Sequence, residues 1–273
     1  MSFYEKLKTI WSKNNSLVCV GLDPDLSRFP DHLKNGSDSI FQFNKAIIDA
    51  THDLVCAFKP QIAYFSAEGA EKQLEQTIHY IKKNYPHIPI ILDAKRGDIG
   101  STAQKYAIEA FERYGADAVT VNPYLGYDSV KPYLSYKDRG TILLCRTSNP
   151  GAADIQDLEV DGEPLYKRVA RLASEHWNTN NNCLLVVGAT WPSQMLEIRK
   201  IVRDMPLLVP GVGAQGGNVE KMVKSGQTND GTGMIISSSR GVLYASSGSN
   251  FAEAARDVVL ELRDAINTYR KKV

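Results

Sequence analysis

The chain has 273 residues, of which 43% are hydrophobic and 23% are charged, a composition typical of a globular protein with a sizeable core. Its 32 Lys and Arg residues nearly balance its 31 Asp and Glu residues, so the formal net charge is +1. This balance excludes a global electrostatic attraction to nucleic acid or to an anionic membrane, and any preference for anions must be local. We expect one domain over residues 1–273, because no linker, charge block or low-complexity tract divides the chain.

The sequence contains no segment typical of a membrane or secreted protein. Residues 1–15 are amphipathic and lack the apolar core of a signal peptide, and no later apolar run reaches the length of about 20 residues that spans a bilayer. The cysteines form no CxxC pair, which argues against disulfides and against zinc; they are Cys19, Cys56, Cys145 and Cys183. We therefore predict a cytoplasmic protein with buried, inert thiols, no metal and no membrane partner.

Short apolar runs recur along the chain and predict β-strands. The runs are nearly continuous rather than alternating, as expected of strands that are buried on both faces. They are LVCVGLD (17–23), VCAFKP (55–60), IPIILDA (88–94), AVTVNP (118–123), TILLCR (141–146), CLLVVG (183–188), PLLVP (206–210) and GMIISSS (233–239).

Most of the segments between these runs have helical periodicity. Residues 252–271 predict a long closing helix, and Pro192 suits the first turn of an earlier one. Eight βα units in about 250 residues are typical of a TIM (β/α)8 barrel, an α/β fold. A doubly wound open sheet is the alternative, but it usually carries a GxGxxG motif after its first strand, and GLDPDLSRFP (21–30) has none.

In a barrel of this kind, catalytic residues gather where the strands end. The ends of the predicted strands hold Asp23, Lys59, Asp93, Lys95, Asp98, Thr147, Ser148, the Gly-rich segment PGVGAQGG (210–217), Ser239 and Arg240. Such a concentration of polar groups predicts a ligand at this end of the barrel.

The most concentrated charge lies in LDAKRGDIGSTA (92–103). Asp93 and Lys95 are two residues apart on a predicted strand, so both side chains are expected to face the barrel mouth, whereas Asp98 follows in a turn and need not point the same way. A lysine between carboxylates keeps its proton, because a nearby opposite charge favours the charged form. Lys95 is therefore expected to donate a proton rather than to act as a nucleophile. The alternative is a surface ion pair, worth at most about 1 kcal/mol.

The last two strand ends indicate a phosphate site. VPGVGAQGG (209–217) contains glycines that let backbone amides approach an anion, and SSSRG (237–241) places Arg240 at the next strand end. TIM barrels frequently bind phosphate with the loops after strands seven and eight. Each feature alone is typical of turns, but their order together predicts a phosphorylated small molecule.

The chain resembles orotidine 5'-phosphate decarboxylases of the longer single-domain branch, over essentially its whole length. DAKRGDIGST (93–102) resembles the Asp-x-Lys-x-x-Asp signature of that family, and the other family motifs follow in the expected order: GLDPD, FKP, TSNPG, VPGVGAQGG and SSSRG. The resemblance implies a homodimer, without metal or organic cofactor, that converts orotidine 5'-phosphate to uridine 5'-phosphate in the last step of de novo pyrimidine nucleotide synthesis.

The resemblance also implies roles for individual residues. The charged array at the reacting carbon would consist of Lys59, Asp93, Lys95 and Asp98, with Asp98 reaching into the neighbouring subunit's site. Asp23 and Thr102 would bind the ribose, Thr102 also across the dimer, and Ser148 would bind the pyrimidine. The phosphate end would be framed by Pro210, Gly211, Gln215 and Arg240. Ser239 stands where many members have glycine before the phosphate-binding arginine, and we include it among the candidate substrate contacts.

The chemistry agrees with these residues. Loss of carbon dioxide from C6 of the orotate ring leaves a vinylic carbanion, and Lys95 would stabilise this charge and then protonate C6. One alternative is a magnesium-dependent sugar-phosphate decarboxylase of the same barrel superfamily, against which TSNPG and SSSRG argue. Another is a non-catalytic phosphate-binding barrel, which the cost of burying charges disfavours. Residues 151–167 form a long connection for which a lid, a dimer element and a surface excursion all stay open.

Overall fold

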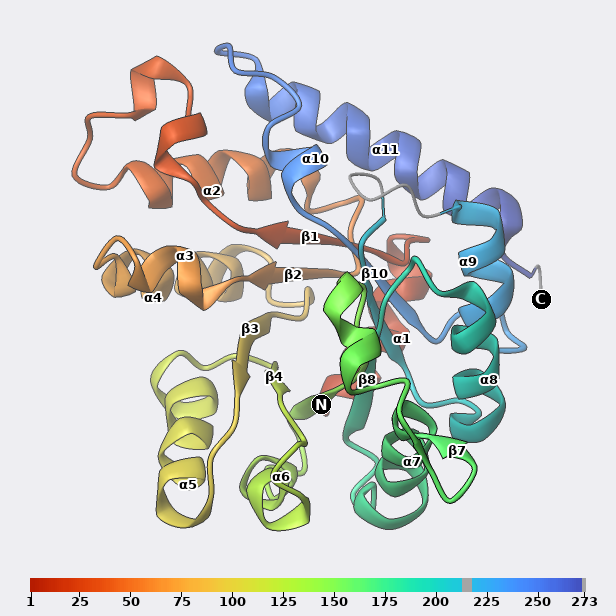
Figure 1. The fold of residues 1–273 in the computed structure, drawn as a ribbon. Coiled ribbons are helices and arrows are strands. Elements are labelled where there is room, and N and C mark those ends of the chain that lie inside the picture. The colour runs from red at the N-terminus through yellow and green to blue at the C-terminus, as the bar shows by residue number, and fades with distance from the viewer. Residues whose placement is uncertain (213–217, 272–273) are drawn as a thin grey trace.

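The computed structural model describes residues 1–212 and 218–271, and a barrel of parallel strands lies at its centre, surrounded by helices (Figure 1). The eight strands are hydrogen-bonded in the order β2, β1, β10, β9, β8, β5, β4, β3. Parallel bridges from Phe58 to Ile90 and from Gln61 to Asp93 join β2 to β3 and close the ring. The predicted TIM barrel is confirmed.

Each predicted apolar run contains one barrel strand. The strands are β1 (Val18–Leu22), β2 (Ala57–Pro60), β3 (Ile91–Arg96), β4 (Ala118–Val121), β5 (Gly140–Arg146), β8 (Cys183–Val187), β9 (Leu207–Pro210) and β10 (Met234–Ser238). Every residue of β1, β2, β4, β8 and β10 is buried, which is why their sequences are mostly apolar. The third strand begins later than its apolar run and continues into its charged end.

Helices connect the strands and cover the outside of the barrel (Figure 1). They are α1 (Phe3–Lys13), α2 (Ser39–Thr51), α3 (Ile62–Ser66), α4 (Glu71–Asn84), α5 (Gly100–Ile108), α6 (Tyr127–Leu134), α7 (Leu165–Arg171), α8 (Pro192–Val202), α9 (Val219–Gly226), α10 (Arg240–Leu243) and α11 (Phe251–Tyr269). Short 3-10 turns are η1 (Leu26–Arg28), η2 (Asp31–Leu33) and η4 (Pro150–Asp154), and π-helical turns η3 (Glu109–Arg113) and η5 (Leu172–Trp177) extend α5 and α7.

Local sequence signals explain where several helices begin. Ser2 accepts a hydrogen bond from the backbone of Glu5, whose side chain accepts one in return from the backbone of Ser2, a capping box at the start of α1. Pro192 occupies the first turn of α8, as predicted. The closing helix α11 packs against α2 on the outside of the barrel.

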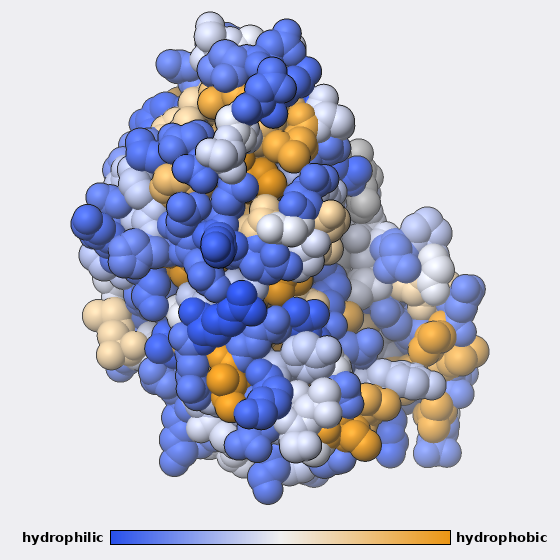
Figure 2. Space-filling model, turned by 90° about the vertical axis from the view of Figure 1, so that its left-hand side faces the viewer, coloured by the Kyte–Doolittle hydropathy of each residue, from blue (hydrophilic) through white to orange (hydrophobic). Residues whose placement is uncertain are grey.

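Apolar packing between the barrel and its helices supplies the core. Phe43 of α2 stacks on Phe29 at a ring distance of 4.2 Å and on Phe251 of α11 at 5.1 Å. Full burial of each such side chain contributes about 1.5–3 kcal/mol. One face of the molecule is mostly hydrophilic, with hydrophobic residues in small separate patches (Figure 2). No helix in residues 1–212 and 218–271 is long and apolar enough to cross a membrane.

The long connection after β5 forms the turn η4 and then a short antiparallel hairpin, β6 (Glu159–Val160) and β7 (Glu163–Pro164). Asp161 and Gly162 at its tip have φ values of 54° and 78°. An Asp-Gly pair with positive φ at both positions is typical of a two-residue hairpin turn. The backbone N–H of Tyr166 then donates to the carbonyl of Gln156 at 3.0 Å, and Sγ of Cys145 in β5 donates to the carbonyl of Tyr166 at 3.2 Å, which joins the connection to the barrel wall.

Candidate active site

Three charged side chains from β2 and β3 meet at the carboxyl end of the barrel. Nζ of Lys59 lies 2.9 Å from Oδ2 of Asp93, and Nζ of Lys95 lies 2.6 Å from Oδ1 of the same carboxylate. Lys59 and Asp93 are buried, whereas 47% of the Lys95 side chain is exposed. One carboxylate therefore holds two ammonium groups, and only Lys95 presents its charge to the space above the barrel.

The ionisation of this cluster follows from burial and charge. Burial by itself raises the pKa of Asp93, but the attraction of Lys59 and Lys95 outweighs it and holds that pKa well below its ordinary value. Burial by itself lowers the pKa of Lys59, but the negative charges of Asp93 and Asp23 raise it well above its ordinary value. Asp93 and Lys59 are thus both ionised at neutral pH.

A break in β3, rather than regular strand alternation, brings Asp93 and Lys95 together. Leu92 pairs with Val119 of β4 and Arg96 pairs with Val121, so the three residues 93–95 face Thr120 alone. Lys95 has a φ of 45°, in the left-handed region that non-glycine residues rarely adopt. Asp93 and Lys95 are close together, as expected from the sequence. The regular alternation of side chains along the strand, on which that expectation was based, is absent.

A cavity of about 880 Å³ opens at this end of the barrel, and the charged cluster lies in its wall. Among the candidate residues, its lining includes Lys59, Asp93, Lys95, Ser148 and Pro210. Much of the remaining wall is apolar and comes from β5, β8, β9, α7 and η5, namely Leu144, Val186, Leu208, Leu165, Val169, Leu172 and Trp177. An apolar pocket with a few convergent polar groups is typical of a small-molecule site.

Ser148 lies on the loop after β5, close against β8. A Cβ atom at Gly188 would lie 2.8 Å from Cα of Ser148, so only glycine allows this approach. Fully buried Arg146 anchors the same loop, because its Nε lies 2.8 Å from Oδ1 of Asp157 and its guanidinium stacks over the ring of Trp191 at 4.3 Å. This ion pair ties the end of β5 to the connection that follows it.

A second contact ties down the same loop. The backbone N–H of Thr147 donates to Oε1 of Gln156 at 2.8 Å, and Nε2 of Gln156 donates to the Thr147 hydroxyl at 2.9 Å. Nε1 of Trp191 donates to the carbonyl of Thr147 at 3.1 Å. The backbone of Thr147, directly before Ser148, is therefore held in place by both Gln156 and Trp191.

Asp23 lies at the end of β1, on the opposite side of the barrel mouth. Its Oδ1 is buried and has no hydrogen-bond partner within residues 1–212 and 218–271. The carbonyl of Asp23 accepts a hydrogen bond from the Tyr244 hydroxyl at 2.8 Å. Ser239 packs over the same strand, because a Cβ atom at Gly21 would collide with its Oγ. The serine that departs from the family pattern thus fills space that glycine at position 21 leaves free.

The candidate phosphate residues lie at the ends of β9 and β10. The carbonyl of Pro210 accepts from the backbone N–H of Ala189 at 2.9 Å, and Gly211 follows with a φ of 97°. Arg240 is exposed and begins α10. Gln215, the remaining predicted phosphate contact, lies outside the described residues.

The single chain does not bring Asp98 or Thr102 to the charged cluster. Oδ1 of Asp98 accepts a hydrogen bond from the backbone of Ile99 at 2.9 Å, and in the described part of the chain no ion pair joins Asp98 to Lys59 or Lys95. Thr102 is exposed on α5. Within one chain the array therefore consists of three residues rather than four.

Two residues that organise the site were not predicted from the sequence. Thr120 contacts the broken segment of β3, and Arg146 anchors the Ser148 loop. Each has a weak signal in the sequence: Thr120 is a polar residue between the two valines of AVTVNP, and Arg146 is the charged end of TILLCR. Neither signal names the partner, because both partners come from other parts of the chain.

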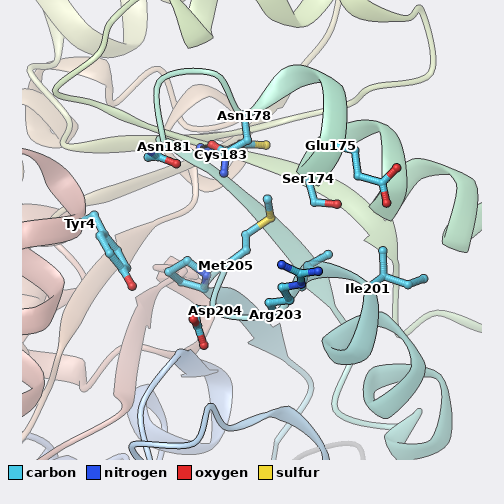
Figure 3. A pocket seen from close by; sticks show the side chains of 12 residues that line it. Tyr4, Ser174, Glu175, Asn178, Asn181, Cys183, Ile201, Arg203, Asp204 and Met205 are labelled. Atoms are coloured by element: carbon cyan, nitrogen blue, oxygen red, sulfur yellow. Dashed lines mark hydrogen bonds between the residues drawn. The ribbon is translucent and has the colours of Figure 1, made fainter.

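A second cavity, of about 600 Å³, lies at the opposite end of the barrel, near the amino ends of β8 and β9 (Figure 3). Its charged lining residues are Glu175, Arg203 and Asp204, together with neutral groups such as Tyr4 and Cys183. It contains no lysine paired with a buried carboxylate, so the cavity at the carboxyl end is the candidate active site.

Comparison with known proteins shows the family to which the chain belongs. The profile of the family described as "Orotidine 5'-phosphate decarboxylase / HUMPS family" matches residues 16–257. An orotidine 5'-phosphate decarboxylase from Cellvibrio japonicus is 71% identical over 272 residues, covering 99% of this chain and 100% of that protein.

Two solved structures from Leishmania donovani resemble the fold. The OMP decarboxylase is 36% identical with a TM-score of 0.84, and the match covers 98% of this chain and 99% of that one. The UMP synthase is 38% identical with a TM-score of 0.85, and the match covers 98% of this chain but 57% of the longer protein. The chain belongs to the orotidine 5'-phosphate decarboxylase / HUMPS family.

Proposed function

We propose that this protein catalyses the decarboxylation of orotidine 5'-phosphate to uridine 5'-phosphate, the last step of de novo pyrimidine nucleotide synthesis. The observation that carries the proposal is the Lys59, Asp93 and Lys95 cluster in the wall of the carboxyl-end cavity. Its family membership and a full-length relative of that name at 71% identity support the same reaction.

Lys95 has the properties that the reaction needs. The bond between C6 and the carboxylate breaks, its electron pair stays on C6, and carbon dioxide departs. The Lys95 ammonium group supplies positive charge where this negative charge develops and then transfers a proton to C6. Because the Lys95 side chain is half exposed, solvent can return the proton after turnover.

Lys59 and Asp93 hold that ammonium group in place. Asp93 contacts Lys95 through one oxygen and Lys59 through the other, so rotation of its carboxylate is opposed from both sides. Preorganised charges of this kind need no rearrangement when the transition state forms. We assign the proton transfer to Lys95 and the orientation of the cluster to Lys59 and Asp93.

The remaining candidate residues are proposed to bind the rest of the nucleotide. Asp23 has a buried oxygen without a partner in the described part of the chain, which suits a hydrogen bond from a ribose hydroxyl. Ser148 lines the cavity and suits a polar edge of the pyrimidine. The phosphate is assigned to the ends of β9 and β10, with contacts from Pro210, Gly211, Gln215, Ser239 and Arg240.

We further propose a homodimer in which Asp98 and Thr102 of one subunit complete the site of the other. In the described part of the chain Asp98 forms no ion pair with Lys59 or Lys95, and Thr102 is exposed on α5, which supports this assignment. Mixing Lys95→Ala with Asp98→Ala chains tests it. Random exchange restores about a quarter of the natural activity, since half the dimers are mixed and each has one intact site. No restoration after demonstrated subunit exchange would contradict the shared site.

The magnesium-dependent sugar-phosphate decarboxylase is not favoured. Lys59 and Lys95 both contact Asp93, so the cluster carries one net positive charge and repels a divalent cation. The relatives described above carry the names of orotidine 5'-phosphate enzymes.

The decisive experiment follows the ultraviolet loss of orotidine 5'-phosphate in the presence of a chelator. We expect the natural chain and Lys72→Ala, which changes an exposed lysine on α4, to convert the substrate equally. We expect Lys95→Ala to lose turnover. Failure of the folded natural chain to convert orotidine 5'-phosphate would overturn the proposal, and sugar phosphates with magnesium would then be tested.

Residues 1–273 are also proposed to form one domain located in the cytoplasm. The first and last helices contact loops that lead into barrel strands, since Phe3 donates its backbone N–H to the carbonyl of Asp138 before β5 at 2.9 Å and Asn267 donates to the carbonyl of Asn15 before β1 at 2.9 Å. The four cysteines are free and buried, which suits a reducing compartment. A single cooperative unfolding transition tests the first proposal, and cell fractionation tests the second.

A further inference from the structure

The hydroxyl group of Thr120 lies at the centre of the break in β3. Its Oγ1 accepts hydrogen bonds from the backbone N–H groups of Ala94, at 3.0 Å, and Lys95, at 2.9 Å. The same hydroxyl donates to Oδ1 of Asp93 at 2.9 Å. Thr120 is 1% exposed, so solvent does not compete for these contacts. One buried hydroxyl thus bonds to each of the three residues that have left the strand pairing.

These bonds compensate for the irregular backbone. A bulge leaves its extra residues without partners in the strand ladder, and a buried N–H group without a partner is costly. The left-handed φ of 45° at Lys95 adds backbone strain. Thr120 satisfies both orphaned N–H groups at the place where the strain occurs, and its neighbours on β4, Val119 and Val121, have no polar side-chain group that could do so.

The same geometry determines the direction of the hydroxyl proton. A threonine hydroxyl has one proton to donate and two lone pairs that accept. Both lone pairs of Thr120 are taken by backbone N–H groups, so the proton points to Oδ1 of Asp93. That oxygen also accepts the 2.6 Å bond from Nζ of Lys95. Thr120 therefore acts at once on the Lys95 backbone and on the carboxylate that holds the Lys95 ammonium group.

We propose that Thr120 is a positioning residue for the decarboxylation, acting through Asp93 and Lys95. Its hydroxyl keeps the bulge in the shape that directs the Lys95 ammonium group into the cavity. The inference rests on the proposed function, because the group that Thr120 positions is the proposed proton donor. A displacement of about 1 Å in a reacting group is enough to cost about 10²-fold in rate.

The test compares Thr120→Val, which removes the hydroxyl and keeps the shape, with Thr120→Ser, which keeps the hydroxyl. We expect kcat to fall by about 10²-fold in the valine variant, with a much smaller change in KM, and to stay within a few-fold of natural in the serine variant. Thr141→Val is the matched control, because Thr141 is a buried residue of β5 whose hydroxyl has no hydrogen-bond partner in the described part of the chain. Its kcat is expected to equal that of the natural chain.

If Thr120→Val does not fold, a second pair of variants tests the role of the hydroxyl. Thr120→Ser and Thr120→Ala both lack the methyl group and differ from each other only in the hydroxyl. Equal kcat in any folded pair that differs by the hydroxyl would overturn the inference, and so would equal losses in the serine and valine variants.

The outcome for the proposed function is separate. If the natural chain converts orotidine 5'-phosphate and Thr120→Val converts it as fast, only the role of Thr120 fails. If the natural chain is inactive, the proposed function fails. Crystal structures of the natural chain and of Thr120→Val then test independently whether Thr120 positions Lys95. An unchanged bulge, with Lys95 still left-handed and its ammonium group still on Asp93, would then overturn the positioning role.

Discussion

Nζ of Lys95 lies 2.6 Å from Oδ1 of Asp93, although both residues belong to a stretch of β3 that has left the regular pairing with β4. The contact joins a half-exposed ammonium group to a buried carboxylate. Asp93 is anchored on its other side by Lys59, so its carboxylate is held between two ammonium groups. The arrangement places one positive charge at the cavity and keeps its counter-charge in the barrel wall.

Removal of the exposed guanidinium at the last strand end is expected to weaken binding more than chemistry. Arg240→Ala should raise KM for orotidine 5'-phosphate by about 10- to 100-fold, the range for a lost hydrogen bond to a charged group. Because Arg240 is assigned to the phosphate, its loss acts through remote binding energy, and kcat falls less. Steady-state kinetics measure the two constants separately.

Two controls accompany this prediction. Arg203→Ala changes an arginine of the opposite cavity and is expected to leave KM unchanged. Orotidine without its phosphate should be converted equally by the natural chain and by Arg240→Ala. A loss of the same size on both substrates would contradict the assignment of Arg240 to the phosphate.

The ion pair behind Ser148 is expected to support both stability and binding. Asp157→Ala leaves the fully buried Arg146 guanidinium without its counter-charge, which should lower the free energy of unfolding by about 2–3 kcal/mol. The value lies below the range of about 3–5 kcal/mol for fully buried pairs because Asp157 is itself 38% exposed. Loosening of the loop should also raise KM. Urea unfolding and kinetics measure the two effects, with the exposed Asp154→Ala of the same loop as control. Equal stability of the two variants would refute the anchoring role.

The depressed pKa of Asp93 predicts a specific loss of stability in acid. The unfolded chain binds a proton at this residue at a higher pH than the folded chain does, because only the folded chain holds Lys59 and Lys95 against it. Asp93 therefore stabilises the fold fully above its ordinary pKa of 3.8, and this stabilisation is lost as the pH falls towards the lower folded value.

Urea unfolding of the natural chain and of Asp93→Asn, at a series of pH values, measures this effect. The natural chain should lose stability more steeply than the variant below about pH 4, because the variant has no proton to take up at this position. Parallel curves in that range would show that the lysines do not act on Asp93 as the structure indicates.

The cysteines are expected to be inert in the folded protein. Burial raises the pKa of Cys19 and of Cys183 to about 12, and it raises the pKa of Cys56 and Cys145 above the ordinary value as well. At about pH 8 few of these thiols are ionised, and the thiolate is the reactive form. Ellman's reagent should therefore detect no rapid reaction in the native protein and four thiols in denaturant. Rapid modification of a native thiol would contradict the burial described here.

Much of the fold could be predicted from the sequence, for a physical reason. A parallel strand that is covered on both faces must be mostly apolar along its length, and so short apolar runs in the sequence predict β1, β4 and β8. Charged residues near the ends of such runs predict the open end of the barrel, and the ion pair between Lys59 and Asp93 lies at that end. The Asp161-Gly162 pair would also have predicted the hairpin in the connection to α7.

The sequence by itself determined the barrel, its strand ends and the kinds of charge gathered there, because these depend on residues that are neighbours in the chain. Only the tertiary structure decided how the charges meet. The Thr120 contact spans 27 residues to Asp93, and it exists because two strands pair out of register. The pairing of Arg146 with Asp157 depends on the path of a returning loop, and in the described part of the chain no ion pair joins Asp98 to Lys59 or Lys95. Contacts of this kind depend on strand register and loop geometry, and these cannot be read from residues that are neighbours in the chain.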